Sequence, residues 1–278
     1  MRRASVETIE VSKYGDQLAQ RIALGELDPD FVVEVLEPFA TERRRQRLQQ
    51  VFADRLHSVT VVMDSICDPH NIAALLRTSE AHGVARIHIV AQEAASVAYA
   101  GVACGTNKWV EVRSHRDAAA CVRELLAAEM VLVAAHPQGD LEPRDLQTLP
   151  RLALVLGNEH SGIGSVLSHA CQHTVRVPMR GLAESLNVSV SGGILLSHAV
   201  AGRSGDVSAL EQRKLYARGL AVTVPHAADI LDRAARETRR NGRVAKDLGS
   251  ANSPAEHAFS QRNATAAPTQ DDTRSRIV

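Results

Sequence analysis

Apolar positions in the middle of the chain form short continuous runs, separated by longer segments with helical spacing. The runs that we expect to be strands are 59–63, 86–90, 130–135, 152–156 and 174–177. The segments 71–82, 117–129 and 186–202 have the spacing of helices. Continuous β-branched runs joined by helices are typical of a parallel sheet that helices cover on both faces. The pattern therefore predicts a doubly wound α/β fold.

The regions before and after this predicted α/β core differ from it in composition and in sequence pattern. We expect residues 1–57, which are charged and helical in pattern, to form a helical N-terminal extension to a core spanning 58–202. Residues 203–247 are expected to form C-terminal helices. From 248 to 278 the chain is rich in small polar residues and has little to bury, so this tail is expected to be disordered.

Amino-acid composition and cysteine spacing exclude only a few classes of protein. The formal net charge is zero, which does not exclude a nucleic-acid partner because local charge matters more than the sum. The four cysteines, Cys67, Cys104, Cys121 and Cys171, have no C-x-x-C spacing, and no His–Cys cluster in the sequence resembles a zinc site. We therefore expect reduced thiols, no metal and a cytoplasmic protein. No signal peptide is evident, and no apolar stretch reaches the roughly 18 residues that span a bilayer.

Three polar segments follow predicted strands or precede the last helix: 68–78, 154–164 and 177–190. In open parallel sheets, ligands bind beyond the carboxyl ends of the strands. These segments are therefore the candidates for a functional site.

Four side chains in these segments have both a functional and a structural interpretation. Arg77 is placed on a helix either to hold a phosphate or to pair with a surface carboxylate. Glu159 lies in a glycine-rich loop that is either a ligand site or a tight turn between strand and helix. Ser185 and Asn187 precede an apolar helix, where either would ordinarily act as an N-cap.

Basic residues gather in the two flanks. The segment 41–57 has the pattern of a helix with Thr41 as its N-cap, and it carries Arg43, Arg44, Arg45, Arg47 and Arg55. A second basic stretch holds Arg233, Arg236, Arg239, Arg240 and Arg243. These arginines are either solvated helix faces or contacts to an RNA backbone.

All three polar segments, in this order, resemble the motifs of the SpoU family of RNA ribose methyltransferases over residues 58–202. Within that family the chain is most similar to the tRNA guanosine 2′-O-methyltransferases of the D-loop, the TrmH type. The similarity rests on residues 69–71 before the Arg-Thr pair, on the block 105–110 that contains Lys108, and on the run 185–190. Asp68 stands where the D-loop enzymes usually carry Lys, and Asn158 and His160 flank Glu159 as in the wider family, which includes rRNA enzymes.

The resemblance implies a SPOUT fold with a C-terminal trefoil knot, a homodimer, S-adenosylmethionine as methyl donor and tRNA as substrate. It assigns catalysis to Arg77, with Asn71, Glu159, Ser185 and Asn187 around the reacting ribose. It places the donor near Ala135, Gly157, Val177 and Leu186. The expected RNA contacts are Arg43, Arg44, Arg45, Arg47, Lys108, Arg239 and Arg240.

Three alternatives remain open from the sequence. The first is a 23S rRNA 2′-O-methyltransferase of the same family. The second is a non-catalytic RNA-binding relative, against which the four intact polar site residues argue. The third is a Rossmann oxidoreductase, whose G-x-G-x-x-G fingerprint is missing from the glycine-rich loop.

Overall fold

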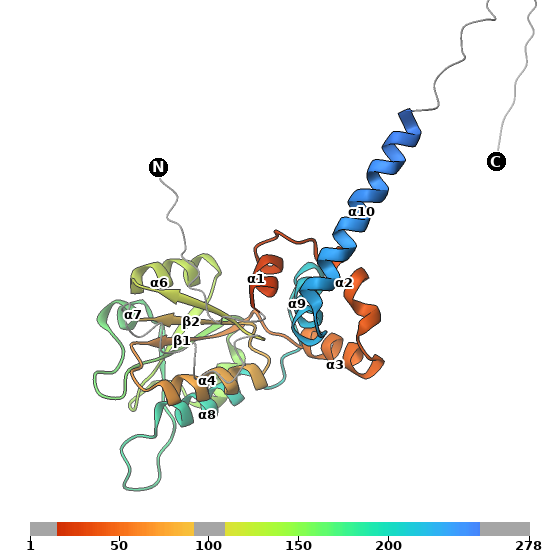
Figure 1. Cartoon of the computed structure of the whole chain (residues 1–278). Helices are drawn as coiled ribbons and strands as arrows, with labels where there is room; N and C mark the ends of the chain where they lie inside the picture. The colour runs from red at the N-terminus through yellow and green to blue at the C-terminus, as the bar shows by residue number, and fades with distance from the viewer. Residues whose placement is uncertain (1–15, 92–108, 251–278) are drawn as a thin grey trace, which may run out of the picture. The chain divides into compact units, whose positions relative to one another are not determined.

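A computed structural model describes residues 16–91 and 109–250, whose strands form a six-stranded, wholly parallel sheet (Figure 1). The strands are β1 (Val59–Asp64), β2 (Arg86–Val90), β3 (Glu111–His115), β4 (Val131–Ala135), β5 (Leu152–Leu156) and β6 (His173–Val175). Their order in the sheet is β3-β2-β1-β5-β4-β6. The predicted α/β class is confirmed. Whether the chain is knotted stays a prediction.

The central strands agree best with the sequence pattern. β2 and β5 have the predicted bounds, and β1 extends one residue further than predicted. The last strand covers 173–175 rather than 174–177, because the chain leaves the sheet before Arg176. β3 was not predicted, since its sequence Glu-Val-Arg-Ser-His has no apolar run and lies at a sheet edge.

Helices cover both faces of the sheet, as expected of a doubly wound fold (Figure 1). On one face α4 (Pro69–Ala81) packs against α8 (Val188–Val200), and the 3-10 helix η3 (Pro143–Thr148) also contacts α8. On the other face α6 (Ala118–Ala127) contacts α7 (Ser165–Ala170). Alternate strand residues separate the two cores: Val61 and Met63 join the α4–α8 side, and Val62 joins the α6 side.

Polar side chains fix where these helices begin. Asp68 Oδ1 accepts a hydrogen bond from the His70 amide at 2.8 Å, and Pro69 occupies the first helical turn of α4. The helix therefore starts two residues before the predicted position. Asp117 caps α6 in the same way, at 3.0 Å from the Ala119 amide. Each cap satisfies an amide that lacks a partner within its helix.

The N-terminal and C-terminal flanks, which were expected to be separate helical regions, share one hydrophobic core. It is built from α1 (Asp16–Ala23), α2 (Pro29–Leu36), α3 (Glu42–Ala53) and α9 (Ala209–Thr223), and the 3-10 helix η1 (Glu37–Phe39) joins α2 to α3. α9 contacts α1, α2 and α3. The first residues of α10 (Ala227–Ser250) join this core through Ala227 and Leu231, and residues from Ala234 onward form a second compact unit. Most of the predicted disordered tail, from 251 onward, lies outside the described residues.

The basic segment 41–57 departs from its prediction in two respects, the end of its helix and the position of Arg55. Thr41 caps α3 as expected, since its Oγ1 accepts from the Arg44 amide at 3.3 Å, but the helix ends at Ala53. Arg55 is 1% exposed and pairs with Glu80 at 2.7 Å. It belongs to the interior, because its guanidinium also bonds the carbonyl oxygens of Glu80 and Val84. No helix of the described residues is long and apolar enough to cross a membrane.

Candidate active site

The loops that follow β1 and β5 are joined by polar side chains at the carboxyl ends of the two strands. Asn158 donates from Nδ2 to the Ser65 carbonyl at 2.8 Å. Its Oδ1 accepts from the amides of His160 and Ser161, at 2.8 and 3.1 Å. Buried Asp64 accepts the Gly164 amide at 2.7 Å. These bonds hold the segment that carries Glu159 against the loop after β1.

The turn containing Glu159 closes tightly on itself. The backbones of Asn158 and Gly162 exchange two hydrogen bonds of 2.9 Å. A Cβ atom added at Gly157 would lie 2.4 Å from the carbonyl carbon of Gly162, so this position admits only glycine without a shift of the backbone. The glycine-rich segment therefore forms a tight turn after β5, and this turn leaves Glu159 exposed at its tip.

Side chains of all three motifs form one hydrogen-bonded chain. Asn187 donates from Nδ2 to Asn71 Oδ1 at 3.0 Å, and Asn71 donates from Nδ2 to Glu159 Oε1 at 2.5 Å. Asn71 is buried, so its amide is held in one orientation. Asn187 also caps α8, since its Oδ1 accepts from the Ser189 amide at 2.8 Å. The Asn187 side chain therefore caps α8 and also takes part in the hydrogen bonds that join the three motif segments.

The hydrogen bonds between Asn187, Asn71 and Glu159 leave one carboxylate oxygen of Glu159 available as an acceptor. Asn71 occupies Oε1 of Glu159, and within the described residues no donor is assigned to Oε2. A fixed carboxylate with a free oxygen at the end of a strand can accept a hydrogen bond from a hydroxyl group of a bound ligand.

Arg77 and Ser185 stand apart from this chain of bonds. Arg77 is exposed on α4, six residues after Asn71, and no carboxylate of the described residues pairs with it. At 3.6 residues per turn its side chain leaves the helix roughly a third of a turn away from Asn71. Ser185 is exposed in the loop before α8. The alternative of a surface ion pair at Arg77 is therefore not realised within the described chain.

Three of the four expected donor-site residues lie at the ends of neighbouring strands. Ala135 ends β4, Gly157 follows β5, and Val177 comes two residues after β6. Ala135 and Val177 are partly buried against the main core. Leu186, the fourth, is partly exposed just before α8. The three strand-end residues present backbone and apolar groups. Such groups can bind an uncharged aromatic ring of a ligand, and they offer no side-chain ligand for a metal ion.

The arginines that are expected to contact RNA differ in their exposure and in their ion pairs. Arg43, Arg44 and Arg47 are exposed along α3, whereas Arg45 is half-buried and pairs with Glu42. Arg239 and Arg240 lie on α10, in the second compact unit, and Lys108 is outside the described residues.

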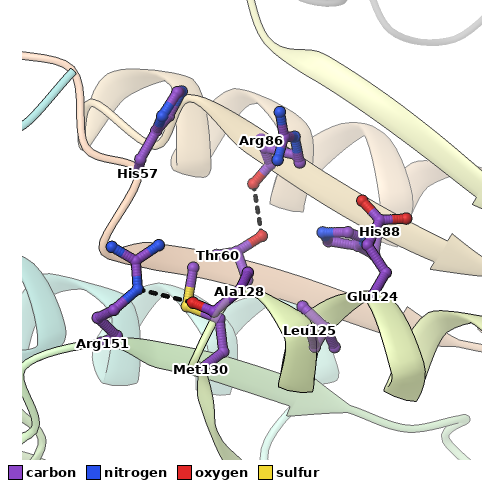
Figure 2. A pocket seen from close by; sticks show the side chains of 9 residues that line it. All are labelled: His57, Thr60, Arg86, His88, Glu124, Leu125, Ala128, Met130 and Arg151. Atoms are coloured by element: carbon purple, nitrogen blue, oxygen red, sulfur yellow. Dashed lines mark hydrogen bonds between the residues drawn. The ribbon is translucent and has the colours of Figure 1, made fainter. Parts of the chain in front are cut away.

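A cavity lies beside α6, and Figure 2 shows the side chains that line it. Its lining residues are His57, Thr60, Arg86, His88, Glu124, Leu125, Ala128, Met130 and Arg151. They come from β1, β2, α6 and the segments beside them, and none of the predicted site residues is among them.

Comparison with known proteins agrees with this geometry. The family model described as the SpoU rRNA Methylase family matches residues 58–197. A tRNA (guanosine(18)-2′-O)-methyltransferase of Escherichia coli is 31% identical over 157 residues, covering 56% of this chain and 69% of that protein. A 23S rRNA (guanosine-2′-O-)-methyltransferase RlmB of Vibrio vulnificus is 28% identical over 166 residues, covering 59% and 67%.

A solved structure is similar as well. The A. aeolicus TrmH/SpoU tRNA modifying enzyme superposes with a TM-score of 0.51 at 27% identity, over 71% of this chain and 97% of that chain. The family match spans the sheet and the loops that carry Asn71, Glu159 and Asn187. The chain therefore belongs to the SpoU rRNA Methylase family of RNA 2′-O-methyltransferases.

Proposed function

We propose that this chain transfers a methyl group from S-adenosylmethionine to the 2′-hydroxyl of the D-loop guanosine in tRNA. The observation that carries the proposal is the hydrogen-bonded chain Asn187–Asn71–Glu159, which joins the three motif segments at the strand ends. The choice of tRNA is supported by the 31% identity to a tRNA (guanosine(18)-2′-O)-methyltransferase.

The methyl donor fits the ends of β4, β5 and β6. Ala135 and Val177 would contact its apolar parts, and the backbone at Gly157, directly after β5, would meet its polar edge. The donor supplies a sulfonium methyl group that is reactive without a metal. The protein's contribution is then chiefly to place the ribose oxygen in line with that methyl group.

Arg77 and Glu159 have complementary tasks in this proposal. The exposed guanidinium of Arg77 binds the phosphate next to the target ribose and stabilises the negative charge that develops on the 2′-oxygen. A guanidinium stays protonated in proteins, so the 2′-proton leaves to water or to the phosphate rather than to Arg77. Glu159 Oε2 accepts a hydrogen bond from the ribose and orients it, while Asn71 holds Oε1.

A second copy of the chain completes the site in this proposal. Leu182 is fully exposed, and Met179 and Val190 are also exposed large apolar residues in the loop before α8 and in its first turn. This loop also carries Ser185, which lies outside the hydrogen-bonded chain. Burying these apolar side chains in a homodimer would remove them from water and place loop residues of one copy beside the other.

The decisive experiment is methyl transfer from labelled S-adenosylmethionine to total RNA, followed by mapping of the modified nucleotide. Label at the D-loop guanosine of tRNA supports the proposal. Label only in 23S rRNA would establish the alternative suggested by the 28% identical relative. Absence of transfer to any RNA, with the donor bound, would assign the chain to the non-catalytic class.

A further inference from the structure

Three buried side chains with metal-binding atoms meet on the α6 face, away from the methyltransferase loops. They are His88 on β2, His115 at the end of β3, and Cys121 on α6. One ligand atom of each lies within 4.8 Å of the other two. No metal was expected from the sequence, because the three residues are spread over two strands and a helix.

The sheet register explains why the two imidazoles meet. Val90 pairs with His115, so His88, two residues earlier on β2, lies on the same face and diagonal to His115. His88 Nδ1 and His115 Nε2 are 2.9 Å apart and share a hydrogen bond. The ring planes are inclined by only 16°. Two imidazole nitrogens at this separation need only a small movement to converge on one ion.

Burial determines which groups of this cluster carry a proton. Burial lowers the pKa of His88 to about 3 and lowers that of His115 as well, so both rings are neutral and have lone pairs at neutral pH. Burial also raises the pKa of Cys121 to about 12. The thiol therefore stays protonated unless a cation displaces its proton, and a bound metal does this directly.

A fourth ligand is within reach. Glu124 follows Cys121 by three residues on α6, which places the two side chains on the same helix face. Its Oε2 is 4.0 Å from His115 Nε2, and its Oε1 accepts from Arg113. The cavity in Figure 2 is lined by both His88 and Glu124, so there is open space directly beside the cluster.

We propose that His88, His115 and Cys121 bind a zinc ion, with Glu124 as the fourth ligand. Two imidazole nitrogens, one thiolate and one carboxylate form a donor set that Zn²⁺ accepts in tetrahedral geometry. Binding releases the thiol proton of Cys121. The imidazole that donates the hydrogen bond between His88 and His115 takes up its other tautomer, with the proton on its second ring nitrogen, and two metal–nitrogen bonds replace that hydrogen bond. The ion ties β2, edge strand β3 and α6 together, and it takes no part in methyl transfer.

Cobalt(II) titration tests this site because Co²⁺ replaces Zn²⁺ and is coloured. The full chain is stripped with a chelator, dialysed and titrated with Co²⁺. We expect one equivalent to bind, with a thiolate-to-cobalt band in the near ultraviolet and the visible bands of tetrahedral cobalt. Adding Zn²⁺ should abolish both. Failure of the wild-type chain to develop the thiolate band would overturn the proposal.

Matched cysteine variants identify the ligand. Cys121→Ala should lose the thiolate band and weaken Zn²⁺ binding by more than the roughly 10–100-fold that loss of an outer-shell partner costs. Cys171→Ala removes another thiol from the same core, outside the cluster, and should behave as wild type. If Cys121→Ala folds poorly, His115→Gln provides the second test, with circular dichroism to check folding. A thiolate band that survives in Cys121→Ala would assign the ion to another cysteine and disprove the site.

Discussion

Asn71 uses both ends of its amide, and this makes it the side chain on which the active-site geometry depends. Nδ2 donates to Glu159 and Oδ1 accepts from Asn187, so the amide has one orientation that satisfies both neighbours. A residue of the same shape with a different hydrogen-bonding pattern would break the chain without leaving a cavity. The effects of orientation and of volume can therefore be separated by substitution.

Asn71→Asp should destabilise the protein by about 2 kcal/mol and strongly reduce methyl transfer, because two carboxylates would face each other where a donor is needed. The double variant Asn71→Asp with Glu159→Gln restores a donor–acceptor pair in the reverse sense. We expect it to recover the melting temperature but not the turnover, since the carboxylate at 159 is lost. Thermal unfolding and labelled-methyl transfer measure the two effects. Recovery of turnover in the double variant would show that Glu159 only positions Asn71.

Arg77→Ala should abolish methyl transfer while leaving donor affinity and folding unchanged, because this exposed side chain supports no part of the fold. Arg77→Lys should rescue little, since an ammonium group cannot replace the planar fork. Arg123→Ala, an exposed arginine on α6, is the matched control and should keep full activity. Transfer by Arg77→Ala within threefold of the control would contradict a catalytic role.

At the scale of the elements, the ion pair between buried Arg55 and partly exposed Glu80 connects the end of the N-terminal helices with α4. Arg55 is 1% exposed, and the carboxylate of Glu80 compensates its charge at 2.7 Å. Removing one member of such a pair leaves an uncompensated charge in the interior. The link therefore holds the flank to the core more firmly than a surface ion pair would.

Glu80→Gln should lower the free energy of unfolding by about 3 kcal/mol, in urea titrations followed by circular dichroism. The control is Glu26→Gln, which breaks an exposed pair with Arg21 and should cost less than about 0.5 kcal/mol. Equal effects of the two substitutions would mean that burial adds nothing to the Arg55–Glu80 pair.

The basic helix α3 provides a test of RNA capture. Replacing Arg43, Arg44 and Arg47 with Ala should weaken tRNA binding and flatten its salt dependence by about one unit of slope for each phosphate that these arginines neutralise. Donor affinity should stay the same. Arg123→Ala with Arg144→Ala removes exposed arginines elsewhere and serves as the control. An unchanged salt slope in the triple variant would exclude α3 from the RNA interface.

Strands that are determined by their own sequence pattern could be predicted from the sequence, and strands that depend on a neighbouring strand could not. β2 and β5 are buried runs whose apolar residues mark their bounds, whereas β3 is polar and needs its neighbour β2 to become a strand. Motif order indicated that Asn71, Glu159 and Asn187 converge. The burial of Arg55 and the meeting of His88 with Cys121 could not be predicted, because both depend on contacts between distant segments.

At the scale of the whole molecule, the proposed homodimer would form over the exposed apolar residues around α8. Leu182→Glu should convert the proposed homodimer to a monomer at micromolar concentration and remove activity with it, because a charge would be buried in an apolar interface. Leu210→Glu changes another exposed leucine, on α9, and should leave the dimer intact. Sedimentation velocity distinguishes these outcomes. A wild-type chain that sediments as a monomer and is fully active would exclude the dimer.

The position of β1 has a consequence for how the protein is synthesised. β1 lies between β2, which follows it closely in the chain, and β5, whose residues are made about ninety positions later. At a translation rate of roughly 5–20 residues per second, one edge of this wholly buried strand stays unpaired for about 5–20 s after it leaves the ribosome. Such an apolar edge is a site for aggregation. Expression yield should therefore respond to growth temperature and to chaperones that cover nascent chains, even for variants whose final stability is unchanged.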